Sequence, residues 1–259
     1  MQTPGTSSAR ASGGVQSLGR ALDLVEIVAE AGGHLAIGEI AGRTDMPLPT
    51  IHRLLKTLVD RGFMRQMSNR RYALGFRLIP LGQVAGATLG TDAKSVLGDL
   101  VDVLGESANL AVLSGDHAEY VAQAQSSHSM RVFTEVGRRV ELHATGVGKA
   151  LLARLDDGQV VEMVQRVGLR AHTEHTISTI SALESALEEI RTQGYALDDQ
   201  EQEVGVRCVA VAVPVEPPTG LAISISGPVP RMTDMLIERA VPLLRAAGEH
   251  LASTWSGRL

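Results

Sequence analysis

A stretch near residue 50 carries basic and polar side chains at helical spacing. Thr50, His52, Arg53 and Lys56 fall on one face of a helix that the sequence predicts over residues 48–61. Arginine and lysine pair with phosphates or guanine edges, and threonine and histidine contact bases, so this face suits the major groove of DNA. The opposite face is an apolar stripe for burial, made by Ile51, Leu54, Leu55, Leu58 and Val59.

More basic residues follow in a predicted hairpin. Residues 63–67 and 72–74 alternate as strands around a polar turn, and Arg65, Arg70 and Arg71 lie on them. Residues 1–77 hold 10 Lys and Arg against 6 Asp and Glu, whereas residues 78–259 hold 14 against 23. A basic first third on an acidic body indicates a small module that binds a polyanion.

A second group of residues could hold a small polar acid. Ser224 and Ser226 alternate on a predicted strand and face one side of a sheet. Cys208 lies in another apolar strand, and Asp198 precedes it by ten residues. The backbone N–H groups of Gly146, Val147 and Gly148 open a helix and would face a small anion. Hydroxyl, thiol, carboxylate and N–H groups together can bind such an acid. Met130 and Leu142 would close the apolar side.

Other chemistries fit the sequence less well. The segment around Gly148-Lys149 is no phosphate loop, because His143 and Ala150 stand where glycine and Ser or Thr are needed. His172-Thr173-Glu174-His175 lacks the zinc-protease spacing and a third ligand. Cys208 leaves three interpretations open, namely a buried hydrophobe, a pocket-lining thiol and a nucleophile. We expect no cofactor, no metal and no catalytic residue.

The elements that position the first group form a winged helix-turn-helix over residues 15–77. A helix begins with Ser17 as its N-cap and stops at Gly32-Gly33, a short helix follows over 36–42, and a turn leads to helix 48–61 and the hairpin. Residues 1–14 are expected to be a disordered tail. Residues 78–92 are expected to form a linker helix, with Leu81, Val84 and Leu89 on its apolar stripe.

Residues 93–259 form the second predicted domain. Helices are expected over 95–104, 146–155, 157–167, 181–194 and 232–255. Strands are expected over 108–113, 119–125, 130–136, 206–213 and 221–226, with a turn at 214–220. Strands and helices do not alternate regularly and no glycine fingerprint occurs, so the pattern favours an antiparallel sheet covered by helices. The fold class is therefore α+β.

Several of these segments resemble the IclR family of bacterial transcriptional regulators. They are Val15–Ala21, Ile37–Ala41, Leu48–Leu58 with its Thr-x-His-Arg-Leu-Leu, Tyr72–Gly75, Thr145–Ala150, Asp199–Cys208 and Ile223–Pro228. The resemblance implies a C-terminal GAF-like effector-binding domain and a linker helix that helps form a dimer. It also implies an effector surrounded by Gly146, Val147, Asp198, Cys208, Ser224 and Ser226, with Asp199 as the alternative to Asp198.

Within that family the chain is most similar to actinobacterial repressors of allantoin catabolism. The segments that carry this similarity are residues 47–53, 68–72, 129–139 and 143–149. Glyoxylate or allantoate is then the implied effector.

Composition limits the remaining possibilities. Aromatic residues are 3% of the chain, so base-stacking platforms are not expected. A single cysteine excludes an internal disulfide, and the apolar runs are too short to span a membrane, which makes the cytoplasm the default location.

We therefore expect a homodimeric, or dimer-of-dimers, transcriptional regulator, most often a repressor. Its partners would be a double-stranded DNA operator and a small acid effector, with no membrane partner. The alternatives are a hydrolase or transferase with Cys208 as nucleophile, and a ligand-independent architectural DNA binder.

Overall fold

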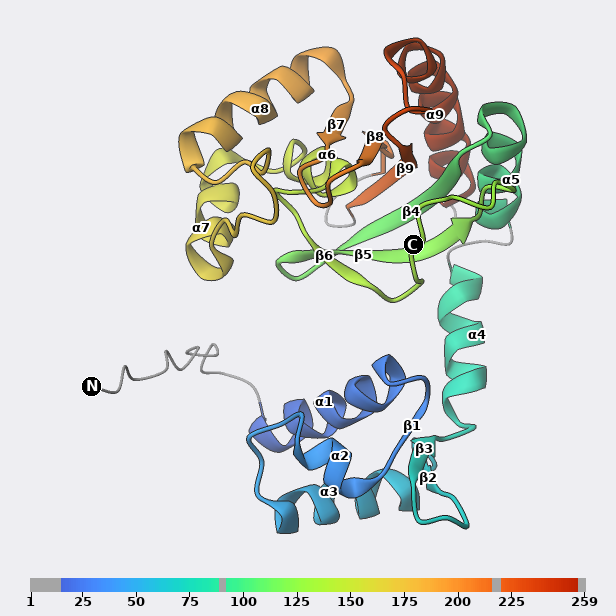
Figure 1. Ribbon diagram of the computed structural model, residues 1–259, viewed down its shortest axis with the longest axis vertical. Coiled ribbons are helices and arrows are strands. Elements are labelled where there is room, and N and C mark those ends of the chain that lie inside the picture. The colour runs from blue at the N-terminus through green and yellow to red at the C-terminus, as the bar shows by residue number, and fades with distance from the viewer. Residues whose placement is uncertain (1–14, 89–91, 216–219, 256–259) are drawn as a thin grey trace. The chain divides into compact units, whose positions relative to one another are not determined.

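Three helices with apolar stripes build the core of the amino-terminal part. The computed structural model describes residues 15–88, 92–215 and 220–255, and the chain divides into two compact units, residues 1–85 and 86–259 (Figure 1). The first unit contains α1 (Gln16–Glu30), β1 (His34–Leu35), α2 (Ile37–Ala41), α3 (Leu48–Asp60), β2 (Met64–Gln66) and β3 (Tyr72–Leu74). Leu24, Ile40, Ile51 and Leu55 are fully buried between the helices.

This unit is the winged helix-turn-helix that the sequence predicts, with two local differences. α1 begins at Gln16, and its N-cap Val15 makes no side-chain bond, so the expected cap at Ser17 is wrong. β1, which the sequence analysis missed, pairs with β3 to give a three-stranded sheet in the order β1-β3-β2. A strand of only two residues has no periodicity to detect. The predicted tail, residues 1–14, lies outside the described residues.

α4 (Leu78–Thr88) follows the hairpin. It corresponds to the predicted linker helix, of which residues 89–91, including Leu89, lie outside the described part. Leu81 and Val84 are exposed on it, as is Ile79. Apolar side chains on a helix surface are candidates for contact with another surface.

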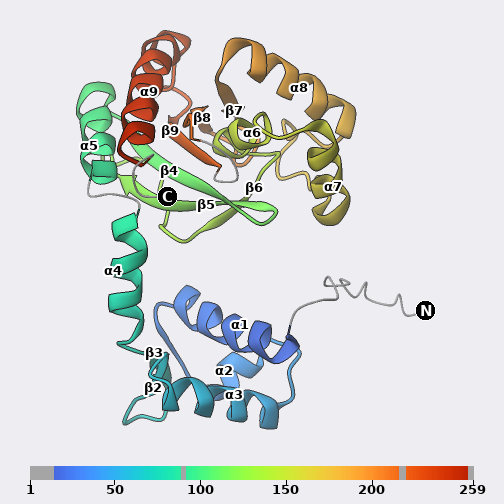
Figure 2. The ribbon, with the colours of Figure 1, turned by 180° about the vertical axis from the view of Figure 1, so that it is seen from behind.

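The second unit is one antiparallel sheet with helices on both faces. Its elements are α5 (Asp92–Leu104), β4 (Ser107–Ser114), β5 (His117–Ala124), β6 (Arg139–Glu141), α6 (Gly146–Leu152), α7 (Asp157–Val167), α8 (Ile180–Gln193), β7 (Ala196–Asp199), β8 (Val206–Ala212), β9 (Leu221–Pro228) and α9 (Asp234–Trp255). The strand order is β6-β5-β4-β9-β8-β7, and every neighbouring pair is antiparallel (Figure 2).

The sheet separates two cores. α5 and α9 pack on one face over Leu110, Ile223 and Ile225. α6, α7 and α8 cover the other face, where Ala210 and Ala222 belong to the second core. Because side chains alternate along a strand, the residues between these apolar ones on β9 point toward α6.

The α+β fold class is confirmed, but one predicted strand is wrong. Residues 130–136 form no strand, and the sheet instead takes up β6 after Gly137, whose φ is +91°. Val132, Phe133 and Thr134 of this segment line a cavity instead of pairing in a sheet. β7 was missed as a strand, and residues 216–219 of the predicted turn lie outside the described part. In the described ranges no helix is long and apolar enough to cross a membrane.

Candidate functional site

The exposed face of α3 is basic and unpaired. His52, Arg53 and Lys56 are exposed, whereas Ile51 and Leu55 are buried. The helix therefore presents one polar side and one apolar side. Within the described ranges these three polar side chains form no hydrogen bond or ion pair. They are therefore available to a polyanion. Thr50 lies at the edge of the same face and is half-buried.

The three hairpin arginines differ in availability. Arg65 donates from Nε to the Leu74 carbonyl at 3.3 Å, and its guanidinium lies over the Phe76 ring. Arg71 pairs with Glu39 of α2 at 2.7 Å. Arg70 has a φ of 62° in the turn and an exposed side chain, with no side-chain partner among the described residues. The structure thus leaves Arg70 as the free guanidinium of this wing.

Five strands bring polar side chains together on the α6 face of the second sheet. Asp198 of β7 lies opposite Cys208 of β8, which lies opposite Ser226 of β9. Asn109 of β4 donates to Ser226 Oγ at 3.4 Å and accepts from Gln123 of β5 at 3.2 Å. The polar row therefore crosses the sheet from β7 to β5.

Asp198, Cys208 and Ser226 of this row form one wall of a small cavity of about 50 Å³. The cavity is lined by Tyr120, Val132, Phe133, Thr134, Arg138, Val140, Thr145, Gly146, Asp198, Gln202, Glu203, Val206, Cys208 and Ser226. Its apolar side is made by Val132, Phe133 and Val140. Such a mixture of apolar walls and a few fixed polar groups is typical of small-molecule sites.

The start of α6 approaches the sheet closely at this cavity. A side chain on Gly146 would place its Cβ 3.1 Å from Cys208 Sγ. The Gly148 N–H donates to Thr145 Oγ1 at 3.1 Å, so the N-cap already satisfies this donor. The Gly148 N–H, which the sequence predicts to face the anion, is therefore already bonded, and the N–H groups of Gly146 and Val147 remain for that role.

Charged groups are buried beside the cavity. Asp198 is 4% exposed, and its Oδ1 accepts from the Glu201 N–H at 2.8 Å and the Gln202 N–H at 3.4 Å. Glu201 pairs with the buried ammonium of Lys149. Thr173 and Thr176 donate to the Gln200 and Glu201 carbonyls at 2.7 and 2.6 Å and hold this turn in place.

Burial shifts the pKa values of three groups here. It raises the pKa of Asp198 to about 7, against hydrogen bonds from the Glu201 N–H that lower it. It raises the pKa of the Cys208 thiol to about 12, and the nearby Asp198 adds to this rise. Burial also raises the pKa of Tyr120. Cys208 is therefore a protonated thiol near neutral pH, and no histidine lines the described walls of the cavity to activate it.

The structure brings most of the predicted effector residues together. Gly146, Asp198, Cys208 and Ser226 line the cavity. The Val147 side chain points into the core, and Ser224 is fully buried with no partner for its Oγ among the described residues. The expected apolar closure is wrong. Met130 is 71% exposed, and Leu142 belongs to the core.

Several site residues escaped the sequence analysis. Asn109 and Gln123 join the polar row only through strand pairing, which no local pattern shows. Lys149 and Glu201 are about fifty positions apart and meet only in the fold. The one available signal was Lys149, a charged residue inside an otherwise apolar and glycine-rich motif, since a buried charge is rarely left unpaired.

Among the described residues, no group of three or more His, Cys, Asp or Glu side chains is placed to hold a metal ion. His172 Nε2 lies 2.8 Å from a Glu141 carboxylate oxygen, and His143 Nε2 lies 3.0 Å from the Arg170 carbonyl oxygen. These contacts account for both imidazoles as structural groups.

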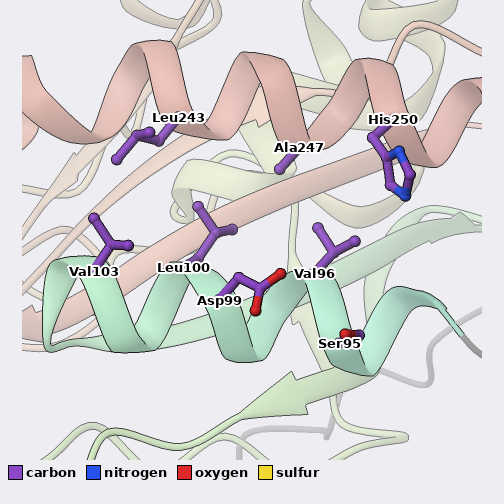
Figure 3. A pocket seen from close by; sticks show the side chains of 8 residues that line it. All are labelled: Ser95, Val96, Asp99, Leu100, Val103, Leu243, Ala247 and His250. Carbon is purple, nitrogen blue, oxygen red and sulfur yellow. The ribbon is translucent and has the colours of Figure 1, made fainter.

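A larger groove of about 420 Å³ lies between α5 and α9, on the other face of the sheet (Figure 3). Its lining is mostly aliphatic, with Val96, Leu100 and Leu243 facing across it, and with Asp99 and His250 as the ionisable members. It shares no residue with the polar cavity.

Family models match both units of the chain. The model described as the IclR helix-turn-helix domain matches residues 17–68, and the model described as the bacterial transcriptional regulator IclR C-terminal domain matches residues 83–253. The two matches cover the α3 face and the cavity, respectively.

Whole-chain comparisons agree with these matches. The transcriptional repressor IclR of Escherichia coli K12 is 37% identical over 95% of this chain and 92% of its own length. The HTH-type transcriptional repressor AllR of Salmonella paratyphi A is 36% identical over 89% of this chain and 86% of its own length. A solved IclR regulator from Alicyclobacillus acidocaldarius is 27% identical and superimposes with a TM-score of 0.84, covering 94% of this chain and 100% of that one.

Proposed function

The chain belongs to the IclR family of bacterial transcriptional regulators, and we propose that it is a repressor whose operator affinity is switched by a small polar carboxylic acid. The observation that carries the switch is the cavity in which Asp198, Cys208 and Ser226 converge. A protein that only binds DNA has no need of a cavity lined by converging polar groups in a second unit.

The DNA-binding part of the proposal rests on α3. His52, Arg53 and Lys56 would enter the major groove, with Thr50 at the edge of the same face, because they form the polar side of a helix whose other side is buried. Arg70 would contact a phosphate from the wing, and Arg65 and Arg71 would do so from its base. Arg71 would first have to leave Glu39, so its contribution is expected to be the smallest of the three.

The effector part rests on the polar row and the start of α6. The N–H groups of Gly146 and Val147 would face the anionic end of the acid, and Ser226 and Cys208 would donate to its oxygens. Ser224 is fully buried next to this wall, and its unpaired hydroxyl would add a further hydrogen-bonding group for the effector. The resemblance to allantoin-catabolism repressors makes glyoxylate and allantoate the acids to test, and the similarity to the repressor AllR supports the same choice.

The switch works only if the acid prefers one of the conformations that differ in DNA affinity. A typical coupling of about 1–3 kcal/mol changes operator affinity roughly 5–150-fold. Loss of DNA binding on addition of the acid is the expected direction for derepression.

We also propose that the regulator is at least a homodimer, and that it can form a dimer of dimers. One helix-turn-helix buries little surface on DNA, and tight operator binding usually takes two modules related by the protein's two-fold axis. Leu81 and Val84, both exposed on α4, are the described members of the candidate seam.

The decisive experiment begins with genomic footprinting, followed by titration of the recovered operator in the presence of glyoxylate or allantoate. Ser226→Ala should weaken binding of the acid at least severalfold and leave ligand-free operator affinity unchanged. Ser181→Ala, an exposed serine on α8, serves as the matched control. Equal acid binding by Ser226→Ala and wild type would show that the cavity is not the effector site. Operator affinity that ignores every small acid would favour an architectural DNA binder.

A further inference from the structure

Two carboxyl groups and one ammonium group are buried together beside the cavity. Asp198, Glu201 and Lys149 are 4%, 8% and 4% exposed, respectively. Lys149 pairs with Glu201, and the pair is neutral. Among the described residues, Asp198 receives hydrogen bonds from backbone N–H groups only, and none of these residues provides a second buried cation to pair with it when it is ionised.

The other ionisable groups around Asp198 do not change this balance. Arg138 and Glu203 line the exposed rim of the cavity with opposite charges. Cys208 from β8 and Tyr120 from β5 stay neutral, because burial raises the pKa of each. The cavity with an ionised Asp198 therefore carries one uncompensated negative charge.

Asp198 also has one oxygen free to face a ligand. Its Oδ1 holds the turn that follows β7, through the Glu201 and Gln202 N–H groups. Its Oδ2 has no hydrogen-bond partner among the described residues, and Asp198 lines the cavity. In a cavity of about 50 Å³ an acid as small as glyoxylate would place its carboxylate close to this oxygen.

This inference rests on the proposed function. We propose that the acid effector binds together with one proton, which Asp198 takes up and shares with the effector's carboxylate through a hydrogen bond from Oδ2. Two carboxylates in one enclosed site repel each other strongly, and a shared proton removes that repulsion. Asp198 is then a proton-accepting specificity residue.

The electrostatics of the cavity prepare Asp198 for this role. Burial raises its pKa to about 7, the Glu201 carboxylate raises it further, and Lys149 lowers it. A second carboxylate in the cavity would raise this pKa again. Proton uptake on binding should therefore be incomplete below neutral pH and approach one proton per site in weakly alkaline buffer.

A pH-dependent affinity follows from this coupling. Above the pKa that Asp198 has without the acid, the affinity for the acid should fall about tenfold per pH unit, because each binding event must also take a proton from solution. The effector would then relieve repression most easily at lower pH.

The test is titration calorimetry of the full chain with glyoxylate and with allantoate. Each titration is run at about pH 6 and about pH 8 in two buffers of different ionisation enthalpy, which reports proton uptake directly. Wild type should take up close to one proton at the higher pH and lose affinity roughly tenfold or more. Asp198→Asn should bind without proton uptake and with the same affinity at both pH values. Asp199→Asn, exposed on the next position of β7, should behave as wild type.

The outcomes separate this inference from the proposed function. Binding of either acid to wild type with no proton uptake would overturn the inference and leave the proposed effector site intact. Failure of both acids to bind wild type would overturn the proposed effector class and this inference with it. The wild-type buffer series needs no variant, so it tests the inference even if Asp198→Asn misfolds.

Discussion

Replacing Lys149 by methionine tests the buried charge balance directly. Methionine keeps the apolar length of the side chain but removes the ammonium that pairs with Glu201. The side chains of Lys149 and Glu201 are only 5% and 10% exposed, so the pair belongs to the buried class and not to the weak surface class. Removing one partner would leave Glu201 buried beside Asp198 with no cation between them.

The expected loss of stability is large. Breaking a buried pair from one side typically costs about 3–5 kcal/mol. For a unit the size of residues 86–259 this corresponds to a fall in Tm of roughly 6–20 °C. The double variant Lys149→Met with Glu201→Leu should recover most of the loss, because it removes both charges and fills similar volume. The Glu201 backbone contacts to Asp198 and Thr176 do not depend on its side chain.

Scanning calorimetry of the full chain at about pH 6 and about pH 8 measures the effect. The loss caused by Lys149→Met should grow as pH rises, because an unpaired buried carboxyl holds its proton in the folded state and releases it in the unfolded state. A loss below about 1 kcal/mol would place the pair in the surface class and refute the reasoning. A double variant no more stable than the single one would show that packing, and not charge, explains the loss.

Three further predictions concern other parts of the chain. Arg53→Ala should weaken operator binding by about 1–3 kcal/mol and relax sequence preference, whereas Lys56→Ala should mainly reduce the salt dependence, as gel-shift titrations at several salt concentrations would show. Gly148→Ala should lower the unfolding temperature of the second unit in scanning calorimetry, because its Cβ would overlap the Leu142 carbonyl oxygen. Gly158→Ala places its Cβ in open space and serves as the control. Folding raises the pKa of Asp198 from 3.8 to about 7, so between these pH values the folded protein keeps the Asp198 proton that the unfolded chain releases. The free energy of unfolding should therefore fall by about 4 kcal/mol as pH rises from about 4 to about 7. In urea unfolding, Asp198→Asn should remove this pH dependence.

The local patterns of the chain predicted those elements whose periodicity spans several turns. α3 and its buried stripe follow from apolar residues at helical spacing, and the pair Ser224 and Ser226 follows from alternation on one strand. Both depend on neighbours in sequence. The same logic failed for residues 130–136, where the consecutive residues Val132, Phe133 and Thr134 line the cavity and the segment forms no strand.

Contacts between segments that are far apart in the chain could not be predicted from a single sequence. Asn109 joins the polar row because β4 pairs with β9, and Arg71 forms an ion pair with Glu39 of α2, 32 positions earlier in the sequence. No local sequence pattern indicates either contact. The polar residues of the cavity were predicted where a single strand carried them, and missed where strand pairing assembled them.

The size of the cavity bears on which acid it can hold. A water molecule needs about 10–15 Å³ of such space, so a cavity of about 50 Å³ corresponds to roughly three to five waters. That volume suits glyoxylate. Allantoate carries ureido groups and is larger, so one wall of the cavity would have to move outward to admit it. The wall formed by β7, β8 and β9 is fixed by ladder hydrogen bonds. The opposite wall is the segment of Val132 to Thr134, which has no strand pairing and carries Phe133 at 59% exposure. Under the proposed function, the polar row would set the chemistry of the effector, and this unpaired segment would set its size.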